Sequence, residues 1–488
     1  MDQRNNRERF IGVASGLGNN VNNMVGAGIF SSPGTVWRSV GSPWIALILW
    51  AVGGLVSLCG TLTYTELGSQ FQIGAGETTY LEYSFPKPRR LLSYSFTMMY
   101  ILPAGISAVV NICAQYLLFT LGLNGKGCDL YEEFHPLYFN GHNFWRLKLT
   151  TLAILAVIAL YHSFSNKWAN RVNQALATTK VLTVLTVVIL GLSFAKRVHN
   201  SNWDMFSPAE SFTRDVSTTE WIQRYVTAML TILFAYGGWN NLSYLTEEYE
   251  TGGSYRNLLI SNTGAVGIVT ILYLLANLAY AAVLNVGTVI GTTGSDPNEI
   301  IGIYFAAQID RGSVDTVSPD AKVKGARALA FFIALSAFGT AGVLMQSASR
   351  VLDLAGRHNY VPLISPWLST WNNRLGTPVN SFIALFTWCS ILTLVVPGNS
   401  SFEFLAELEQ YSIYFFFLLA AIGALLLRRR GGLERRTYRA PLFALFLFIL
   451  FALLIVVLSS LGVVALTGVL WWVLNDRFTR EDETADNI

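Results

Sequence analysis

The hydrophobic stretches of this chain constrain its fold more than any other feature, because a run of roughly 20 predominantly apolar residues is long enough to cross a bilayer as a helix. The pattern predicts twelve such helices, near residues 11 to 37, 43 to 71, 92 to 122, 147 to 164, 169 to 195, 221 to 247, 257 to 284, 325 to 354, 378 to 396, 402 to 427, 441 to 457 and 460 to 475. The last two are short and adjoin at Ser459 and Ser460, so a single bent or re-entrant helix is an alternative there. The sequence therefore predicts an all-α membrane protein with about twelve transmembrane helices.

Composition supports this class and weakens several others. Of the 488 residues, 52% are hydrophobic and 13% are charged, whereas soluble domains contain about 25% charged residues. The basic residues are spread over many loops, so they form no concentrated surface for nucleic acid. The four cysteines lack the paired spacing of a metal or redox site, and we expect neither a metal nor a cofactor. They are Cys59, Cys113, Cys128 and Cys389.

The distribution of basic residues predicts the orientation of the chain. If the N-terminus is cytoplasmic, about 20 of the 33 basic residues fall in inner loops and tails, which is the bias expected of cytoplasmic loops. We therefore expect both termini in the cytoplasm and the protein in the plasma membrane. The predicted parts are an N-terminal tail (1–10), a first repeat of five helices with an outer loop (11–200), a second repeat (201–430), two final helices (431–476) and a C-terminal tail (477–488).

Glycine interrupts two of the predicted spans, at Val25-Gly26-Ala27-Gly28 and at Phe234-Ala235-Tyr236-Gly237-Gly238-Trp239-Asn240. A broken backbone at membrane depth is tolerated only where it lines a cavity or is buried in protein. The two interruptions open spans one and six, and an odd number of crossings separates these spans, so the two halves start from opposite sides of the membrane. This placement predicts a 5+5 inverted repeat of the LeuT-like type, with helices 1 and 6 unwound at a midplane binding site. The alternative is that these small residues only let helices pack closely.

The chemistry of the two interruptions favours an α-amino acid as ligand. Amides that begin the second half of span one, around Gly26 to Gly28, carry partial positive charge and suit a carboxylate. Carbonyls that end the first half-helices, around Met24, Val25 and residues 234 to 236, carry partial negative charge and suit an ammonium group. A ligand with both groups on one carbon satisfies both ends together.

Lys180 lies deep within a predicted span. It is more than ten residues from either end of the segment 169 to 195, or roughly 16 Å from each surface, which is too far for snorkelling. A lysine at this depth costs several kcal/mol unless it is partnered, and it indicates a functional role. The alternative is a lysine bonded to nearby carbonyls, which would still brace neighbouring helices.

Several motifs resemble those of the amino acid-polyamine-organocation (APC) superfamily. The string from Gly26 to Gly34 is similar to the first-helix signature of that superfamily, and the string from Phe234 to Asn240 is similar to the sixth-helix signature of its L-type amino acid transporter (LAT) branch. Further matching strings are Thr246-Glu247-Glu248, Tyr64-Thr65-Glu66-Leu67-Gly68, Gly74-Ala75-Gly76-Glu77 and Ser347-Ala348-Ser349-Arg350. The resemblance extends from about residue 10 to about residue 475. Within the branch, residues 80 to 89 look most like fungal permeases of the methionine-permease type.

This resemblance implies a transporter of neutral L-amino acids, large neutral ones and methionine included, that works by alternating access without sodium. It implies that Gly26, Ala27 and Gly28 contact the substrate carboxylate, and that the backbone of Phe234, Ala235 and Tyr236, up to Gly237, contacts its amine. The Phe234 ring would act as a gate, Asn240 would steady the broken helix, and the Lys180 ammonium would replace a sodium ion between spans one and eight. Ordinary packing is the alternative for the aromatic side chains.

The sequence is compatible with two ways of driving transport and with two assembly states. Proton symport and obligatory exchange are both possible, with Lys180, Glu407 and Glu409 as candidate proton carriers; Glu66 and Glu77 are expected at the inner face, forming helix-end hydrogen bonds. Animal relatives of the LAT branch place a cysteine near the position of Cys128 to bond a single-span subunit, but the flanking sequence differs, and we expect the chain to act alone. The sequon at Asn399 faces outside close to the membrane.

Other function classes are weaker. A receptor that binds an amino acid without transporting it would need cytoplasmic surface, and the tails and inner loops are short. A transporter of cationic amino acids or polyamines is a further alternative. The spans contain no His-rich box, nucleophile elbow or metal-ligand cluster for an enzyme, and no charged ring of a channel. The N-terminal tail is shorter than in fungal relatives, and the loop between the last two helices is almost absent; a trimmed chain is one explanation, which the sequence leaves open.

Overall fold

The computed structural model describes residues 9–71, 73–102, 105–123, 142–195, 217–249, 255–284, 301–311, 321–396, 399–430 and 438–459. Apart from two isolated β-bridges, every regular element in these ranges is a helix. The elements are α1 (Val13–Met24), α2 (Gly28–Val40), α3 (Pro43–Gln70), α4 (Glu77–Ser84), α5 (Leu91–Ile101), α6 (Gly105–Thr120), α7 (His142–Phe164), α8 (Asn166–Ala195), α10 (Thr218–Ala235), η3 (Asn241–Tyr244), η4 (Thr246–Glu248), α11 (Tyr255–Val283), α13 (Ile301–Arg311), α14 (Ala321–Arg357), α15 (Ser365–Leu368), α16 (Val379–Val395), α17 (Asn399–Arg430) and α18 (Leu442–Ser459).

Seven helical stretches of the described chain are long and apolar enough to cross a membrane. They are Pro43–Gln70, Leu91–Thr120, Phe144–Phe164, Asn166–Ala195, Tyr255–Val283, Lys324–Arg357 and Ser412–Arg430, and Val379–Val395 and Leu442–Val457 are shorter apolar helices. The all-helical membrane class is thereby confirmed. Two predicted spans, 11 to 37 and 221 to 247, are each divided into separate helices. The segment 460 to 475 lies outside the described residues, and the count of twelve remains a prediction.

Local sequence explains several of the helix ends. The side chain of Ser42 accepts a hydrogen bond from the amide of Ile45 at 3.4 Å, and Pro43 follows it at the first helical position of α3, which suits proline because that amide needs no helical partner. The side chain of Ser217 caps α10 in the same way, at 3.2 Å from the amide of Glu220. Gly41 ends α2 with φ of 69°, the left-handed conformation that glycine adopts without steric strain.

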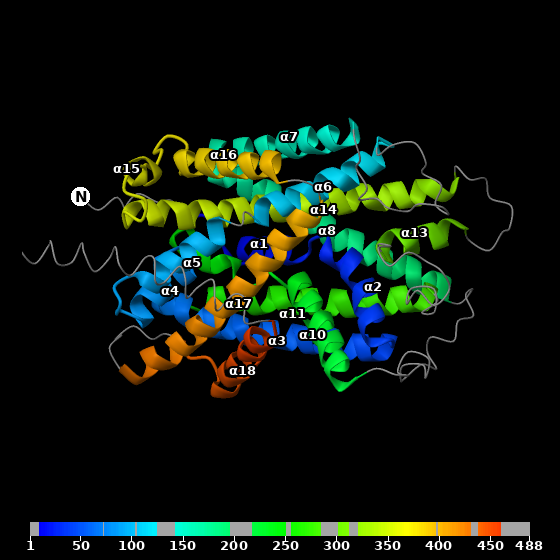
Figure 1. Cartoon of the computed structure of the whole chain (residues 1–488), viewed down its shortest axis with the longest axis horizontal. Coiled ribbons are helices and arrows are strands. Elements are labelled where there is room, and N and C mark those ends of the chain that lie inside the picture. Colours follow the sequence, from blue (N-terminus) through cyan, green and yellow to red (C-terminus); the bar gives the residue numbers. More distant parts are fainter. Residues whose placement is uncertain are drawn as a thin grey trace, which may run out of the picture.

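The long helices α3, α8, α11 and α14 run along the long axis of the molecule, and α17 crosses them obliquely (Figure 1). The short helix α1 packs with α8, α11 and α14 and lies near the middle of the molecule in Figure 1. Residues 18 to 24 of α1 are all buried. The centre of the fold is therefore occupied by a short helix that ends inside the protein.

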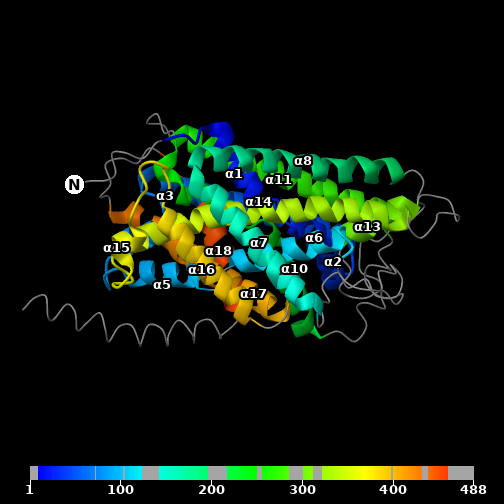
Figure 2. The ribbon, with the colours of Figure 1, turned by 90° about the horizontal axis from the view of Figure 1, so that it is seen from above.

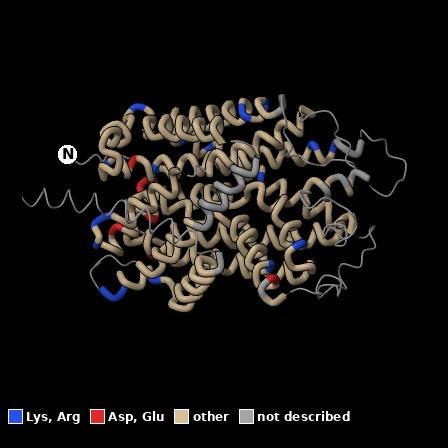
Figure 3. Tube along the Cα trace, in the orientation of Figure 1, with Lys and Arg blue, Asp and Glu red and all other residues tan. Residues whose placement is uncertain are grey.

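Large apolar side chains cover much of the outer surface of the helices. Ile48 on α3, Ile189 on α8 and Phe443 on α18 are 62%, 63% and 70% exposed. Soluble proteins rarely expose apolar patches of this extent, so a lipid environment explains them. The two ends of the molecule carry different elements. One end, which we call the N-terminal face, holds α4, α15 and residues 9 to 12, and α13 lies toward the opposite end (Figures 1 and 2). Most of the described acidic residues lie toward the N-terminal face (Figure 3).

Candidate functional site

The first interruption, break one, comprises residues 25 to 27 between α1 and α2. Val25 leaves the helical conformation, with φ of −78° and ψ of 83°, and the amide of Gly26 turns back to the carbonyl of Met24 at 2.9 Å. No side chain caps the first turn of α2. Gly26 and Ala27 are partly exposed although their neighbours on both sides are buried. The amides that begin α2 therefore border an accessible space, as a carboxylate site requires.

The second interruption, break two, comprises residues 236 to 240 between α10 and η3. Its backbone closes in short turns, with the amide of Gly237 on the carbonyl of Phe234 at 3.0 Å. Gly238 has φ of 101°, and a Cβ there would lie 2.6 Å from Cγ of Asn23 on α1. Only glycine fits this position, because the conformation is strained for other residues and the space is filled.

The two breaks lie side by side in the interior. A Cβ on Gly28 would be 3.1 Å from Cα of Ala235, so the backbones of α2 and α10 are nearly in contact. The hydroxyl of Tyr273 on α11 lies 2.7 Å from the carbonyl oxygen of Met24 and 2.9 Å from that of Ala235. One hydroxyl group therefore joins the last carbonyls of α1 and α10.

Side chains from two further helices, α8 and α14, also hold the carbonyls at the end of α1. Lys180 on α8 donates from Nζ to the carbonyl of Asn22 at 2.5 Å and to Oγ1 of Thr340 on α14 at 2.9 Å. Ser336, one turn before Thr340, donates to the carbonyl of Val25 at 2.8 Å. A helix end leaves such carbonyls without helical partners, and here the bundle supplies the donors.

Lys180 is 3% exposed and connects α8 with α1 and α14. The approach is close, since a Cβ on Gly339 would lie 3.0 Å from Cε of Lys180. Its ammonium contacts one backbone oxygen and one hydroxyl oxygen, the kind of ligands that a hard monovalent cation uses. Lys180 thus bonds α1 and α14, which lie in predicted spans one and eight; its role in place of a sodium ion stays a prediction.

The predicted aromatic residues of break two have different surroundings. Phe234 is 41% exposed although Ala235 and Tyr236 beside it are buried. The hydroxyl of Tyr236 donates to the carbonyl of Trp50 on α3 at 3.1 Å, so its side chain turns away from break one and into the core. Asn240 donates from Nδ2 to Oε1 of Glu77 at 2.9 Å.

The N-terminal face is closed below the two breaks by a buried ion pair. Arg350 on α14 donates from Nε to Oε1 of Glu248 on η4 at 2.6 Å, with exposures of 3% and 2%, and from Nη2 to Asn166 at 2.9 Å. The amides of Phe10 and Ile11 bond the carbonyl of Glu248. The chain that leads into α1, the helix η4 that follows break two, and α14 therefore meet at one point.

The other carboxylates named from the sequence are buried and partnered across elements. Glu66 is fully buried and accepts from Nε of Arg428 at 2.8 Å and from the amide of Ala440 at 2.9 Å. Cys128 lies outside the described residues, and nothing is described of the side chains of Glu407 and Glu409. Among the described residues, no group of three His, Cys, Asp or Glu side chains could hold a metal ion.

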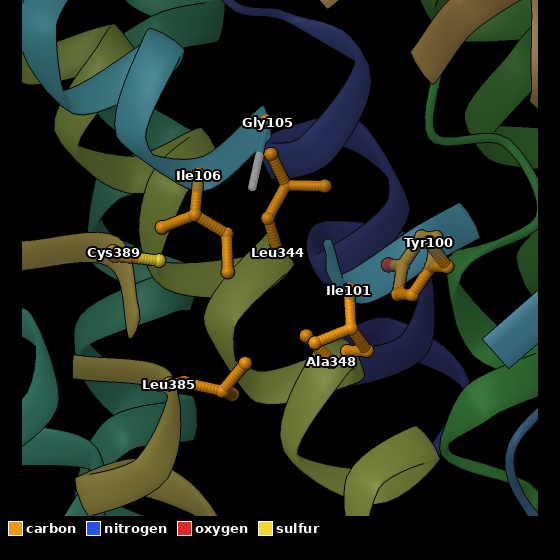
Figure 4. A pocket seen from close by; sticks show the side chains of 8 residues that line it. All are labelled: Tyr100, Ile101, Gly105, Ile106, Leu344, Ala348, Leu385 and Cys389. Carbon is orange, nitrogen blue, oxygen red and sulfur yellow. The ribbon is translucent and has the colours of Figure 1, made fainter. Parts of the chain in front are cut away.

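A small cavity lies beyond α14 as seen from break one. Figure 4 shows side chains of α5, α6, α14 and α16 converging on it; they are Tyr100, Ile101, Gly105, Ile106, Leu344, Ala348, Leu385 and Cys389. Leu344 is one turn along α14 from Thr340. The lining is mainly apolar and contains no residue of either break.

Sequence reasoning missed Tyr273, Ser336 and Thr340. The spacing of Ser336 and Thr340 on an otherwise apolar helix was a usable signal, because residues four apart share a face. Tyr273 gave no such signal, since an aromatic residue in an apolar span is ordinary.

Comparison with known proteins covers most of the chain. A family model described as "Amino acid permease" matches residues 15–475 of the chain. The human cystine/glutamate transporter is 26% identical over 472 residues, which cover 95% of this chain and 84% of that protein. The human large neutral amino acids transporter small subunit 2 is 26% identical over 391 residues, 80% of this chain and 64% of that protein. The mouse b(0,+)-type amino acid transporter 1 is 26% identical over 450 residues, 91% and 81% of the two chains.

Proposed function

Since this chain belongs to the amino acid permease family of the APC superfamily, we propose that it carries neutral L-amino acids across a membrane by alternating access, without sodium. The observation that supports this most is the meeting of break one, break two and the Lys180 ammonium in the centre of the bundle. Its relatives are amino acid transporters and not enzymes. We thus propose the substrate class, the transport mechanism and the membrane in which the protein resides.

In the proposed complex, the substrate carboxylate lies at Gly26, Ala27 and Gly28, where partial positive charge and open space coincide. The amides of Ala27 and Gly28 face it, since the amide of Gly26 donates to the carbonyl of Met24. The ammonium group lies toward the carbonyls of Phe234 and Ala235. The carbonyl oxygen of Ala235 accepts one hydrogen bond from Tyr273, and it can accept a second one from the ammonium group because a carbonyl oxygen has two lone pairs. Phe234, partly exposed above them, is the gate. Met24, Val25, Tyr236, Gly237 and Asn240 shape the site.

A neutral side chain is favoured by the charges near the breaks. The polar groups that contact break one come from Tyr273, Ser336, Thr340 and Lys180, and no carboxylate is among these contacts. A cationic side chain would be repelled by Lys180 and would find no counter-ion in this group. This argues against the cationic amino acid or polyamine alternative.

The proposed architecture is the 5+5 inverted repeat with twelve spans, and the proposed location is the plasma membrane with both termini cytoplasmic. The N-terminal face is then the cytoplasmic one, and the Glu248–Arg350 pair closes it while Gly26 and Phe234 stay accessible. The chain acts without a disulfide-linked subunit through Cys128, and methionine is among its substrates, as in fungal methionine permeases.

The test is uptake of labelled leucine and methionine into proteoliposomes that contain the purified protein. Uptake is expected to be the same in sodium and in choline, and to be inhibited by neutral amino acids more strongly than by arginine or spermidine. A loss of uptake in choline would refute sodium independence. Binding of leucine without any uptake would favour the receptor alternative.

The role of Lys180 is tested by Lys180→Met beside Thr178→Ala, an exposed residue of the same helix that bonds only its own turn. Lys180→Met is expected to abolish uptake, because the end of α1 and the middle of α14 lose the ammonium that joins them. Thr178→Ala is expected to transport normally. Full uptake by Lys180→Met would contradict the role given to this residue.

A further inference from the structure

Glu77, the first residue of α4, lies directly below break two. Its side chain is fully buried, and Oε1 accepts a hydrogen bond from Asn240 at 2.9 Å. Nδ2 of Asn240 also lies 3.1 Å from the hydroxyl of Tyr244 in η3. The carboxyl group is therefore attached to the segment that continues break two, whereas α4 itself lies between the spans α3 and α5.

The loop before Glu77 holds the same segment through its backbone. The amide of Gly76 donates to the carbonyl of Ser243 at 3.1 Å, and the amide of Ala75 donates to that of Tyr244 at 3.3 Å. Both residues have positive φ, 50° for Gly76 and 70° for Ala75, and such a conformation in alanine persists only when the surroundings enforce it. Residues 74 to 77 thus form a clasp on residues 240 to 244.

The groups that face the Glu77 carboxyl are polar but uncharged. They are Tyr64 from α3, Tyr80 from α4 itself, and Tyr244 and Asn240 from the segment of break two; Tyr100 of α5 stacks on Tyr244 behind them. No lysine, arginine or histidine of the described residues is among the groups that act on it. The nearby charged pairs on this face are Glu82–Arg90, Glu82–His358, Glu247–Arg357, Asp353–Arg357, Glu248–Arg350 and Glu66–Arg428.

One oxygen of the carboxyl, Oε2, is buried without a hydrogen-bond partner among the described residues. A buried carboxylate without a cation and with an unpaired oxygen is unfavourable, whereas the neutral acid tolerates this place. Burial accordingly raises the pKa of Glu77, and the hydrogen-bonding groups around it, the hydroxyl of Tyr244 first and then Asn240 and Tyr64, oppose the rise without cancelling it.

We propose that Glu77 is a proton-binding site that is linked to the closing of the N-terminal face. The carboxyl group is neutral while residues 240 to 248 lie over it. When this segment moves away and water enters, the O–H bond breaks and the proton passes to water at that face. The inference rests on the proposed function for its place in a transport cycle, and it gives this chain a coupling proton.

The sign of the pH dependence follows from the difference between the two states. The closed state binds the proton more tightly than the hydrated open state, so acid favours the closed state. This preference is lost as the pH rises through the closed-state pKa. Each unit of difference between the two pKa values changes the opening equilibrium about tenfold.

Hydrogen–deuterium exchange tests this without requiring a substrate. Peptides that cover residues 240 to 249 of the full chain in nanodiscs are measured from about pH 5 to about pH 8, with correction for the intrinsic exchange rate at each pH. In the wild type, protection of this segment is expected to fall severalfold as the pH rises. Glu77→Gln is always neutral and is expected to remain protected at every pH, whereas Glu77→Asp still titrates and should retain a pH response.

Glu82→Gln is the matched control, because Glu82 lies on the same helix, is partly exposed and pairs with Arg90 and His358. It is expected to follow the wild type. The proposal is overturned if Glu77→Gln shows the pH response of the wild type, or if the wild type shows none. Uptake is measured separately: a chain with the pH response but without transport of any amino acid would refute the proposed function and leave the proton site in place.

Discussion

Break one and break two interrupt helices in similar ways but are held differently. The carbonyls of Asn22, Met24 and Val25 around break one are each bonded by a side chain from another long helix. Among the described residues, break two shares Tyr273 with that network, and its Trp239 carbonyl accepts a hydrogen bond from Asn20 of α1. Its far end is held instead at the N-terminal face, by Glu77 and by the Glu248–Arg350 pair.

This difference suggests a division of labour. Buried groups that are fully bonded to several rigid helices form a stiff platform, and break one presents its amides from such a platform. Break two is attached at its end by contacts that open together when the N-terminal face opens. We therefore expect changes near break one to alter binding, and changes along residues 236 to 248 to alter the conformational equilibrium.

The largest effect is expected from Arg350→Met, which removes one partner of the buried pair that holds the end of break two. The carboxylate of Glu248 is then left buried and unpaired, and the loss of stability should be about 3 to 5 kcal/mol. Thermal unfolding in detergent measures it. Arg374→Met, which changes an exposed arginine on the same face, is the control and should alter stability little. Equal losses of stability in the two variants would show that the Glu248–Arg350 pair does not hold the segment after break two.

Gly238→Ala should have the next largest effect, because it acts where the two breaks touch. The new Cβ would meet Asn23 at 2.6 Å in a backbone with φ of 101°, and strain and overpacking together should destabilise the fold by about 2 to 4 kcal/mol. Gly267→Ala on α11 meets no atom within 4 Å and should be neutral or slightly stabilising. If Gly238→Ala unfolded at the same temperature as the wild type, the close contact between the two breaks would not contribute to stability.

Sequence predicted the positions of the breaks but not the bonds that hold them. Glycine-interrupted apolar runs are visible in one dimension, and so is Lys180, since a lysine at that depth requires a partner. Partners that come from helices far along the chain, such as Tyr273 and Ser336, depend on how each helix is rotated in the bundle. A single sequence does not specify those rotations, because the hydrophobic pattern of a span buried on most sides has no preferred face.

The same reasoning explains Glu77. Its motif was recognised, and a carboxylate near a helix start suggested a helix-end hydrogen bond. The partner, however, is Asn240, 163 residues away, and the contact depends on the loop of residues 74 to 76 folding under break two. Sequence placed both residues in separate motifs and gave no sign that they meet.

Tyr273→Phe should have an intermediate effect that touches both breaks. The carbonyls of Met24 and Ala235 lose a shared donor, and the unsatisfied groups should lower stability by about 1 to 3 kcal/mol. Ser336→Ala removes a donor from break one only. If break one is the binding platform, both variants should raise the KM for leucine, and only Tyr273→Phe should also change the protection of residues 236 to 240 against hydrogen exchange.

The smallest effect on stability is expected from Phe234→Ala, although its effect on transport should be clear. A side chain that is 41% exposed loses less on truncation than a buried phenylalanine, for which about 3 to 5 kcal/mol is typical. As a gate, Phe234 would restrict exchange of the bound amino acid with the open side, so its removal should raise the KM and speed release of preloaded leucine. Ile222→Ala, at an exposed position of the same helix, controls for the removal of an exposed apolar side chain. It should leave the KM and the rate of leucine release unchanged. If Phe234→Ala lost as much stability as the truncation of a buried phenylalanine and left the KM unchanged, the ring would serve packing and not gating. Break two would then have no moving gate, and the proposed difference between break two and break one would fail.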